Sequence, residues 1–146
     1  MVKVKFAKCR DGALVPTYGS ASAAGADLYA CLSEAEVILP HETKLIPTGL
    51  KMELPAGYAG LIYARSGLAL KRNLAPANKV GVVDSDYRGE VMVALHNHGQ
   101  TAQTVEHGER IAQLVVTPYL TVSFEEAEAL SDTERGAGGF GSTGTK

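Results

Sequence analysis

Short segments in which apolar and polar residues alternate recur along this chain, and this pattern most constrains its fold. Residues 2–6 alternate valine or phenylalanine with lysine, and residues 50–54 alternate leucine or methionine with lysine or glutamate. A period of two is typical of a strand with one buried face. Further runs rich in Val, Ile and Leu, separated by Gly, Pro, Asn or Asp, span residues 37–39, 60–63, 90–95, 111–116 and 122–124. Many short strands at this spacing predict a sandwich or a barrel.

Only residues 66–72 look helical, with Ser66 as a candidate N-cap and two basic residues in the last turn. A chain of 146 residues has the size of one domain. We therefore expect an all-β domain with one short helix over residues 1–134. Residues 135–146 are expected to form a mobile, glycine-rich C-terminal arm.

Charge and hydropathy exclude some classes of protein. Fourteen Lys and Arg stand against sixteen Asp and Glu, without a basic block, which argues against binding to nucleic acid. No stretch approaches the roughly 20 apolar residues of a membrane-spanning helix. The N-terminus alternates charge instead of opening an apolar run, so we expect a cytoplasmic protein. Cys9 and Cys31 lack the spacing of a metal site or a disulfide framework and are expected to be buried or incidental thiols.

The C-terminal arm carries side chains suited to a phosphorylated ligand with a planar ring. Five glycines between residues 136 and 144 surround Phe140, Ser142 and Thr143, and Arg135 precedes them. The arginine fork and the two hydroxyls can bind phosphate, and the phenylalanine offers a flat apolar face. Composition alone equally describes a flexible terminus, because glycine costs entropy on ordering and supplies no packing.

Asp27 lies in a run of small and apolar residues, 24–30, where a carboxylate needs a partner. One interpretation is a turn or strand-end aspartate that accepts hydrogen bonds from nearby backbone N–H groups. The other is an anchor for hydrated Mg²⁺, which often keeps its waters and takes direct oxygens from substrate phosphates. The residues around Asp27 leave both interpretations open.

Arg65, Ser66 and Gly67 stand at the start of the expected helix. Helix N-termini bind anions, and an arginine beside free N–H groups favours phosphate. An ordinary capped helix with a surface arginine is the alternative. Farther along, Gln113 lies between apolar neighbours in an expected strand, where a glutamine side chain needs hydrogen bonds from the fold or from a ligand.

Residues 78–90 read as a hairpin, in which an apolar arm, 80–83, runs into a turn at 84–86 and returns through 91–95. Asp84 then lies where the strand becomes the turn, and its carboxylate can take a proton from water or hold a ligand hydroxyl. Tyr87 offers a ring face for a sugar. Unpaired strand edges beside Asn78 could bind the edge of a pyrimidine. The alternative is a polar hairpin tip in which aspartate caps the turn.

Taken in order, these five segments resemble the motifs of the trimeric, all-β deoxyuridine triphosphatase family, over nearly the whole chain. The resemblance implies a jelly-roll sandwich or barrel and a homotrimer whose three active sites are each assembled from three subunits. It implies hydrolysis of dUTP at the α-phosphorus, with Mg²⁺ on the triphosphate. The products are dUMP, which supplies dTMP synthesis, and pyrophosphate.

The same resemblance assigns roles to individual residues. Asp84 deprotonates the attacking water and contacts the 3′-hydroxyl, while Tyr87 stacks under the sugar. The uracil edge is recognised by Asn78, by the main chain of Gly81, Val82 and Val83, and by Met92. It implies that the phosphates are bound by Arg65, Ser66, Gly67 and Gln113, and that Asp27 holds Mg²⁺ through water. In the arm, Arg135, Ser142 and Thr143 meet the terminal phosphates and Phe140 covers the uracil.

Two rival functions remain at this point. A dCTP deaminase-like enzyme has a similar β-fold but needs a glutamate in a Leu-Glu-Leu context, where this chain has Val93-Ala94-Leu95. Alanine can relay no proton. A non-catalytic nucleotide-binding β-sandwich would not need a candidate base, phosphate donors and a closing arm together.

Overall fold

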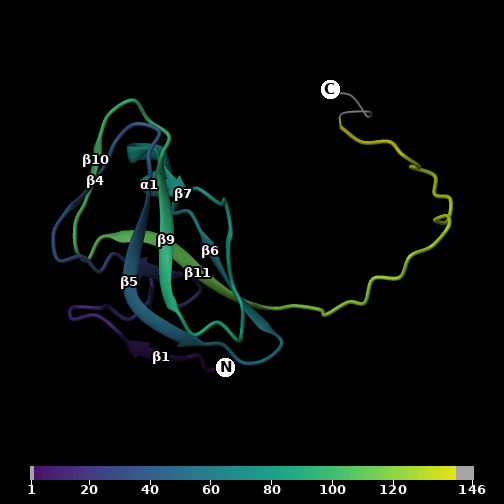
Figure 1. The fold of residues 1–146 in the computed structure, drawn as a ribbon, viewed down its shortest axis with the longest axis horizontal. Helices are drawn as coiled ribbons and strands as arrows, with labels where there is room; N and C mark the ends of the chain where they lie inside the picture. The colour runs from purple at the N-terminus through teal and green to yellow at the C-terminus, as the bar shows by residue number, and fades with distance from the viewer. Residues whose placement is uncertain (1, 141–146) are drawn as a thin grey trace.

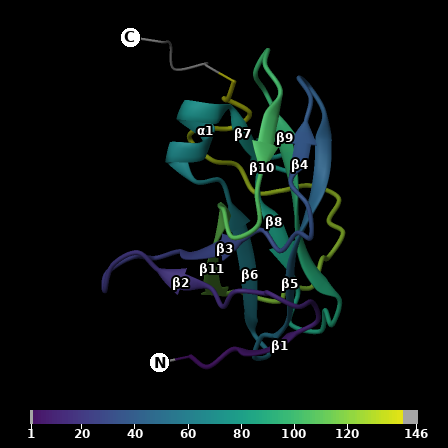
Figure 2. The ribbon, with the colours of Figure 1, turned by 90° about the vertical axis from the view of Figure 1, so that its left-hand side faces the viewer.

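The computed structural model describes residues 2–140 and folds them into two main antiparallel β-sheets around a shared apolar core (Figures 1 and 2). The first sheet has the order β1 (Lys5–Lys8), β5 (Thr43–Glu53), β9 (Glu90–Asn97) and β7 (Leu74–Pro76). The second has the order β2 (Thr17–Tyr18), β3 (Ala26–Tyr29), β11 (Arg110–Pro118), β6 (Tyr58–Tyr63) and β8 (Gly81–Val83). A small third sheet pairs β10 (Gln103–Val105) with β4 (Glu36–Ile38). The all-β, jelly-roll sandwich expected from the sequence is confirmed, and its sheets do not close into a barrel.

Strand β9 shows how the alternating pattern builds the core. Its burial alternates over eight residues, and Val91, Val93 and Leu95 point into the core at 2% exposure or less. They meet buried residues of β5, among them Ile46 and Leu50, in the same cluster. Burial of side chains of this size stabilises the fold by about 1.5–3 kcal/mol each.

Two strand expectations are wrong. The N-terminal alternation does not produce a half-buried strand, because β1 lies at the edge of its sheet and all four of its residues are exposed. Residues 122–124 form no strand. Val122 and Phe124 are 62% and 97% exposed, since the chain leaves the sheet after Pro118 and passes no strand with which it could pair.

The expected helix is confirmed as α1 (Ser66–Arg72), but its cap is displaced by one residue. Arg65, in extended conformation, occupies the N-cap position, and Ser66 is the first helical residue. No described side chain caps the helix. Its C-terminus is closed by Asn73 in the left-handed conformation, whose N–H bonds back to the helix, and Lys71 and Arg72 lie in the last turn as expected.

The expected hairpin of residues 78–95 is also wrong. Strand β8 pairs with β6, whereas β9 pairs with β5 and β7, so the two arms belong to different sheets. The segment from Asp84 to Gly89 therefore crosses between the sheets as an arch. The edge of β8 away from β6 carries no partner strand among the described residues.

After β11 the chain extends away from the sheets, and residues 119–140 contain no helix or strand (Figure 1). Cys9 is exposed, Cys31 is buried, and both are free thiols. Among the described residues, no helix has the length and apolar character needed to cross a membrane.

Candidate active site

The arch between β8 and β9 borders a cavity of about 350 Å³, which we call the Asp84 pocket. Seven residues singled out from the sequence line it, namely Asn78, Gly81, Val82, Val83, Asp84, Tyr87 and Met92. The structure adds Leu45, Ile62, Glu90 and Val91 to the lining. The sequence analysis therefore selected residues that the fold brings to one cavity, even though it paired the strands wrongly.

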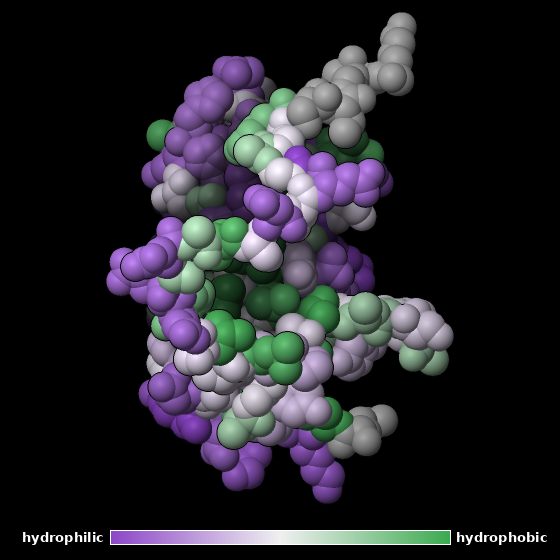
Figure 3. All heavy atoms as spheres, turned by 90° about the vertical axis from the view of Figure 1, so that its right-hand side faces the viewer, coloured by the Kyte–Doolittle hydropathy of each residue, from purple (hydrophilic) through white to green (hydrophobic). Residues whose placement is uncertain are grey.

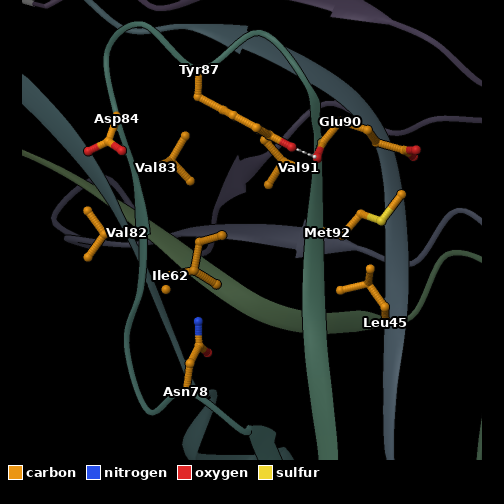
Figure 4. Close-up of a pocket in the computed structure, with 11 residues that line it drawn as sticks. Leu45, Ile62, Asn78, Val82, Val83, Asp84, Tyr87, Glu90, Val91 and Met92 are labelled. Carbon is orange, nitrogen blue, oxygen red and sulfur yellow. Dashed lines mark hydrogen bonds between the residues drawn. The ribbon is translucent and has the colours of Figure 1, made fainter.

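Polar groups lie at both ends of the Asp84 pocket and apolar side chains lie between them (Figure 4). Asn78 stands at one end, Asp84 and Tyr87 stand at the other, and Met92 lines the cavity from β9. Asp84 directly follows β8, where the strand turns into the arch as expected, and its side chain is exposed. A planar ring fits between the apolar walls, with hydrogen-bonding groups available at each end.

Tyr87 lies across the open end of this pocket. Its hydroxyl donates to the backbone carbonyl of Glu90 at 2.9 Å, which fixes the direction of the ring. The ring packs directly against Gly89, where a Cβ would overlap the tyrosine hydroxyl. Any side chain at Gly89 would therefore displace the Tyr87 ring.

A second cavity, of about 230 Å³, lies at the start of α1, and we call it the Arg65 pocket. It is lined by Asp27, Arg65, Ser66, Gly67 and Gln113, the residues that the sequence pointed to for phosphates and metal, together with Gly19, Ala23, Gly25 and Arg110. Ser66 and Gly67 are exposed, and a Cβ on Gly67 would meet nothing within 4 Å. The backbone at the helix start is therefore open to a ligand.

The partner that Asp27 requires is a pair of arginines. Asp27 is 8% exposed as a residue, and its carboxylate accepts from Arg65 Nε at 2.7 Å and from Arg110 Nη1 at 3.4 Å. Each guanidinium group has further N–H donors that do not bond to Asp27. The arrangement fixes two cations at the rim of the Arg65 pocket, where they can attract an anion.

Gln113 is held against the floor of the same pocket. Its Nε2 donates to the carbonyl of Ala64 at 2.8 Å, and its Oε1 would lie 2.5 Å from a Cβ on Gly25. The fold thus satisfies the amide donor. Gly25 is the residue that leaves room for the side chain.

Arg110 is the residue of this pocket that the sequence analysis missed. Strict alternation would place Arg110 and Gln113 on opposite faces of β11, because they are three residues apart. The pairing of β11 with β3 shifts register between Arg110 and Ala112, and this bulge brings both side chains to one pocket. The sequence signal that could have found it is the basic residue next to Glu109 in a segment already selected for Gln113.

The Arg65 pocket fits magnesium as an ion carried by a triphosphate. A carboxylate offers about four lone-pair sites. Arg65 and Arg110 use two of those of Asp27, which leaves capacity for the waters of a hydrated ion. No cluster of three or more candidate metal ligands occurs over residues 2–140.

Residues 119–140 extend away from the two sheets (Figure 1), and none of them lines either pocket. Arg135 Nε donates to the Gly138 carbonyl at 2.8 Å, and Phe140 is fully exposed. Ser142 and Thr143 lie outside the described residues. Over residues 2–140, one chain therefore does not bring Arg135 and Phe140 to the two pockets that the other selected residues line.

The jelly-roll fold and its two pockets define an all-β protein with sites suited to a small ligand that carries a planar ring and negative charge. A family model described as dUTPase matches residues 11–144. The chain belongs to the dUTPase family.

Individual relatives agree along the full chain. The deoxyuridine 5′-triphosphate nucleotidohydrolase of Hahella chejuensis is 47% identical over 100% of this chain and 97% of its own length. The enzyme of the same name from a Hydrogenobaculum species is 46% identical over 99% of this chain and 100% of its own length. Among solved structures, the Staphylococcus bacteriophage 80alpha dUTPase G164S mutant with dUpNHpp superposes with a TM-score of 0.89. It is 27% identical, over 98% of this chain and 99% of that one.

Proposed function

We propose that this chain hydrolyses dUTP to dUMP and pyrophosphate, using Asp84 as the catalytic base. The observation that carries the proposal is the Asp84 pocket, which places a carboxylate, a tyrosine ring and an asparagine around one apolar slot. A slot of this kind suits a deoxynucleoside, with its sugar near Asp84 and Tyr87 and its base near Asn78. Membership of the dUTPase family supports the same substrate.

In this mechanism Asp84 takes a proton from water that attacks the α-phosphorus, and it also accepts a hydrogen bond from the 3′-hydroxyl. A carboxylate in this role contributes about 10²–10⁴-fold to a rate. Its position at the end of β8 gives it the support of a paired strand on one side. Because Asp84 contacts the sugar as well as the water, the bound sugar sets the position of this catalytic carboxylate relative to the α-phosphorus.

Selection of the base and sugar falls to the walls of the Asp84 pocket. The uracil edge forms hydrogen bonds with the free edge of β8, over Gly81 to Val83, and with the side-chain amide of Asn78. Met92 limits the space on the opposite side. Tyr87 packs under the sugar and leaves no room for a 2′-hydroxyl. Such steric rejection requires a rigid wall.

The phosphates bind at the Arg65 pocket, where Arg65, Ser66, Gly67 and Gln113 offer donors. We add Arg110 to this set, because it lines the pocket from the β11 bulge. Mg²⁺, when bound to the triphosphate, neutralises charge and aligns the leaving group. Asp27 would hold that ion through water, and Arg135, Ser142 and Thr143 complete the phosphate contacts while Phe140 covers the uracil.

We propose a homotrimer with shared active sites as the working assembly. Within one chain, the residues proposed for the sugar and base, for the phosphates and for closure lie in three separate places. A single chain also exposes large apolar side chains, including Leu45 at 61%, Leu70 at 84% and Val82 at 62%. Figure 3 shows apolar side chains gathered in a hollow in the middle of one face. Contiguous exposed apolar surface of this kind is typical of subunit interfaces.

The division into a catalytic body, residues 1–134, and a closing arm, residues 135–146, forms part of the same proposal. So does a cytoplasmic location, in which the enzyme lowers dUTP and supplies dUMP for dTMP synthesis. Binding to nucleic acid or membrane is not part of the proposed function, since the chain carries a net charge of −2 without a basic block.

An activity assay tests this function directly. Purified protein is mixed with Mg²⁺ and, separately, dUTP, UTP and dCTP, and pyrophosphate and ammonia are followed. We expect pyrophosphate from dUTP and little from the other two. Ammonia from dCTP would indicate a deaminase, although Ala94 supplies no general base on β9. Tight binding of dUTP without turnover would indicate a non-catalytic nucleotide-binding protein.

Replacing Tyr87 by alanine should weaken the discrimination between dUTP and UTP. Removal of the ring opens space beneath the sugar, so we expect the ratio of the two kcat/KM values to fall by about 10- to 100-fold. Steady-state kinetics on both nucleotides measure the ratio. Tyr18→Ala is the matched control, because Tyr18 is an exposed tyrosine outside the Asp84 pocket. An unchanged ratio in Tyr87→Ala would reject the steric role of the ring.

A further inference from the structure

The arch that carries Asp84 and Tyr87 is anchored to the rest of the fold through Glu90. The hydrogen bonds of the Arg88 side chain stay within the arch, with the carbonyls of Ser85 and Tyr87 as acceptors. Over residues 2–140, the side-chain hydrogen bonds that leave the segment from Asp84 to Glu90 all involve the Glu90 carboxylate. Besides the backbone pairing of β8 with β6 and of Glu90 with Lys51, this carboxylate is thus the side-chain anchor of the arch among the described residues.

Three N–H groups hold it. Arg10 donates from Nε at 2.7 Å and from Nη2 at 3.0 Å, one to each carboxylate oxygen, and the Gly49 N–H donates at 2.9 Å. The Glu90 side chain is only 13% exposed, and it points away from the cavity toward β5 (Figure 4). Paired hydrogen bonds from an arginine fork fix the direction as well as the distance of a carboxylate.

The donors are themselves fixed. Gly49 lies at the register shift of β5 with a φ of 71°, and a Cβ there would approach Cys31 Sγ to 2.9 Å. Its carbonyl accepts from the N–H of Cys9 at 2.8 Å, which places the next residue, Arg10, over Glu90. The Arg10 guanidinium lowers the pKa of Glu90 through their hydrogen bonds, so the carboxylate stays ionised at neutral pH.

The backbone of Glu90 connects this fixed carboxylate to the Tyr87 ring of the Asp84 pocket. Its carbonyl accepts the Tyr87 hydroxyl at 2.9 Å, and the next carbonyl, that of Val91, accepts the buried Thr48 hydroxyl at 2.6 Å. The Tyr87 ring is thus tied to a backbone segment that is held on both sides. Tyr87 is 45% exposed, so packing alone does not hold it.

We propose that Arg10 is a positioning residue for sugar selection, which acts through Glu90 to hold the Tyr87 ring in place. Arg10 lines neither the Asp84 pocket nor the Arg65 pocket. The inference rests on the proposed hydrolysis of dUTP, because its effect appears as discrimination against the 2′-hydroxyl. A wall that excludes one hydroxyl works only while it cannot shift, and Arg10 supplies that restraint.

The test compares Arg10→Gln with Lys5→Gln in steady-state kinetics on dUTP and UTP. Lys5 forms an ion pair of 2.9 Å with Glu53 between β1 and β5, so its replacement removes the same charge from the same sheet without touching the arch. In Arg10→Gln we expect the dUTP-to-UTP ratio of kcat/KM to fall about tenfold, mainly through a higher kcat/KM for UTP, with kcat for dUTP within about twofold of wild type. Lys5→Gln should keep the wild-type ratio.

Tyr87→Phe completes a double-mutant cycle, because it removes only the hydroxyl that bonds to Glu90. If Arg10 acts through that bond, its replacement should add little to the effect of Tyr87→Phe. Full additivity, an unchanged ratio in Arg10→Gln, or an equal loss in Lys5→Gln would each overturn the inference. If Arg10→Gln fails to fold, Arg10→Lys replaces it, because lysine keeps the positive charge but cannot donate to both carboxylate oxygens in the same geometry. The dUTP-to-UTP ratio of kcat/KM of Arg10→Lys then tests the inference. If the wild-type protein does not turn over dUTP, the proposed function itself is wrong. If the wild type is active and selective for dUTP, the variants test the role of Arg10 alone.

Discussion

Replacing Asp84 by asparagine should abolish most dUTP hydrolysis while leaving the fold intact. The side chain is exposed at the end of β8, so an amide of nearly the same size costs no packing. An amide takes no proton from water, and we expect kcat to fall by about 10²–10⁴-fold. Binding should survive, because the pocket walls and the phosphate donors remain. Single-turnover kinetics with dUTP, together with calorimetric binding of a non-hydrolysable analogue, separate the two effects.

Asp86 provides the matched control for this prediction. It lies two residues away in the same arch, is also exposed, and does not line the Asp84 pocket. Asp86→Asn therefore makes the same change of charge outside the proposed site, and its turnover should stay near wild type. Loss of activity in Asp86→Asn with near-normal turnover in Asp84→Asn would move the base from one carboxylate to the other.

The arch also shows where sequence reasoning about this fold succeeded and where it failed. A run rich in Val, Ile and Leu at residues 90–95 correctly predicted the strand that carries Val91, Val93 and Leu95, because strand-forming residues bounded by turn signals are a local signature. The turn signal at residues 84–86 correctly predicted a reversal of the chain. It could not say that β8 would pair with β6 instead of β9, since strand pairing depends on contacts distant in sequence.

The Arg65 pocket shows the same limit for a charged site. The sequence indicated that Asp27 needs a partner, but its partners are 38 and 83 residues away. Arg110 was missed because a bulge reverses the face on which it lies, and local alternation does not predict bulges. Residue types and their order thus predicted side chains that line the two pockets, while the pairing of strands decides where each one lies.

Deleting residues 135–146 should sharply reduce turnover with little change in thermal stability. The described part of this segment bonds only locally, with Arg135 donating to Gly138, and Phe140 packs against nothing. We expect the melting temperature to stay within about 1–2 °C of wild type, because residues 135–140 contribute nothing to the apolar core. Loss of the proposed phosphate donors and of closure should lower kcat by about 10²–10³-fold. A truncated chain that unfolds would show that the arm is structural.

Mixing two inactive variants tests whether the arm serves a neighbouring subunit. Asp84→Asn chains keep the arm, and truncated chains keep Asp84. If one site takes Asp84 and the arm from different subunits, co-refolded 1:1 trimers contain about a quarter of sites with both groups intact. Activity should then return on mixing, with a solution mass of a trimer. If each chain closes its own site, every site lacks one group and the mixture stays inactive. The arrangement in one chain favours recovery, because β11 ends at Pro118 and residues 119–140 lead away from the two sheets and line neither pocket.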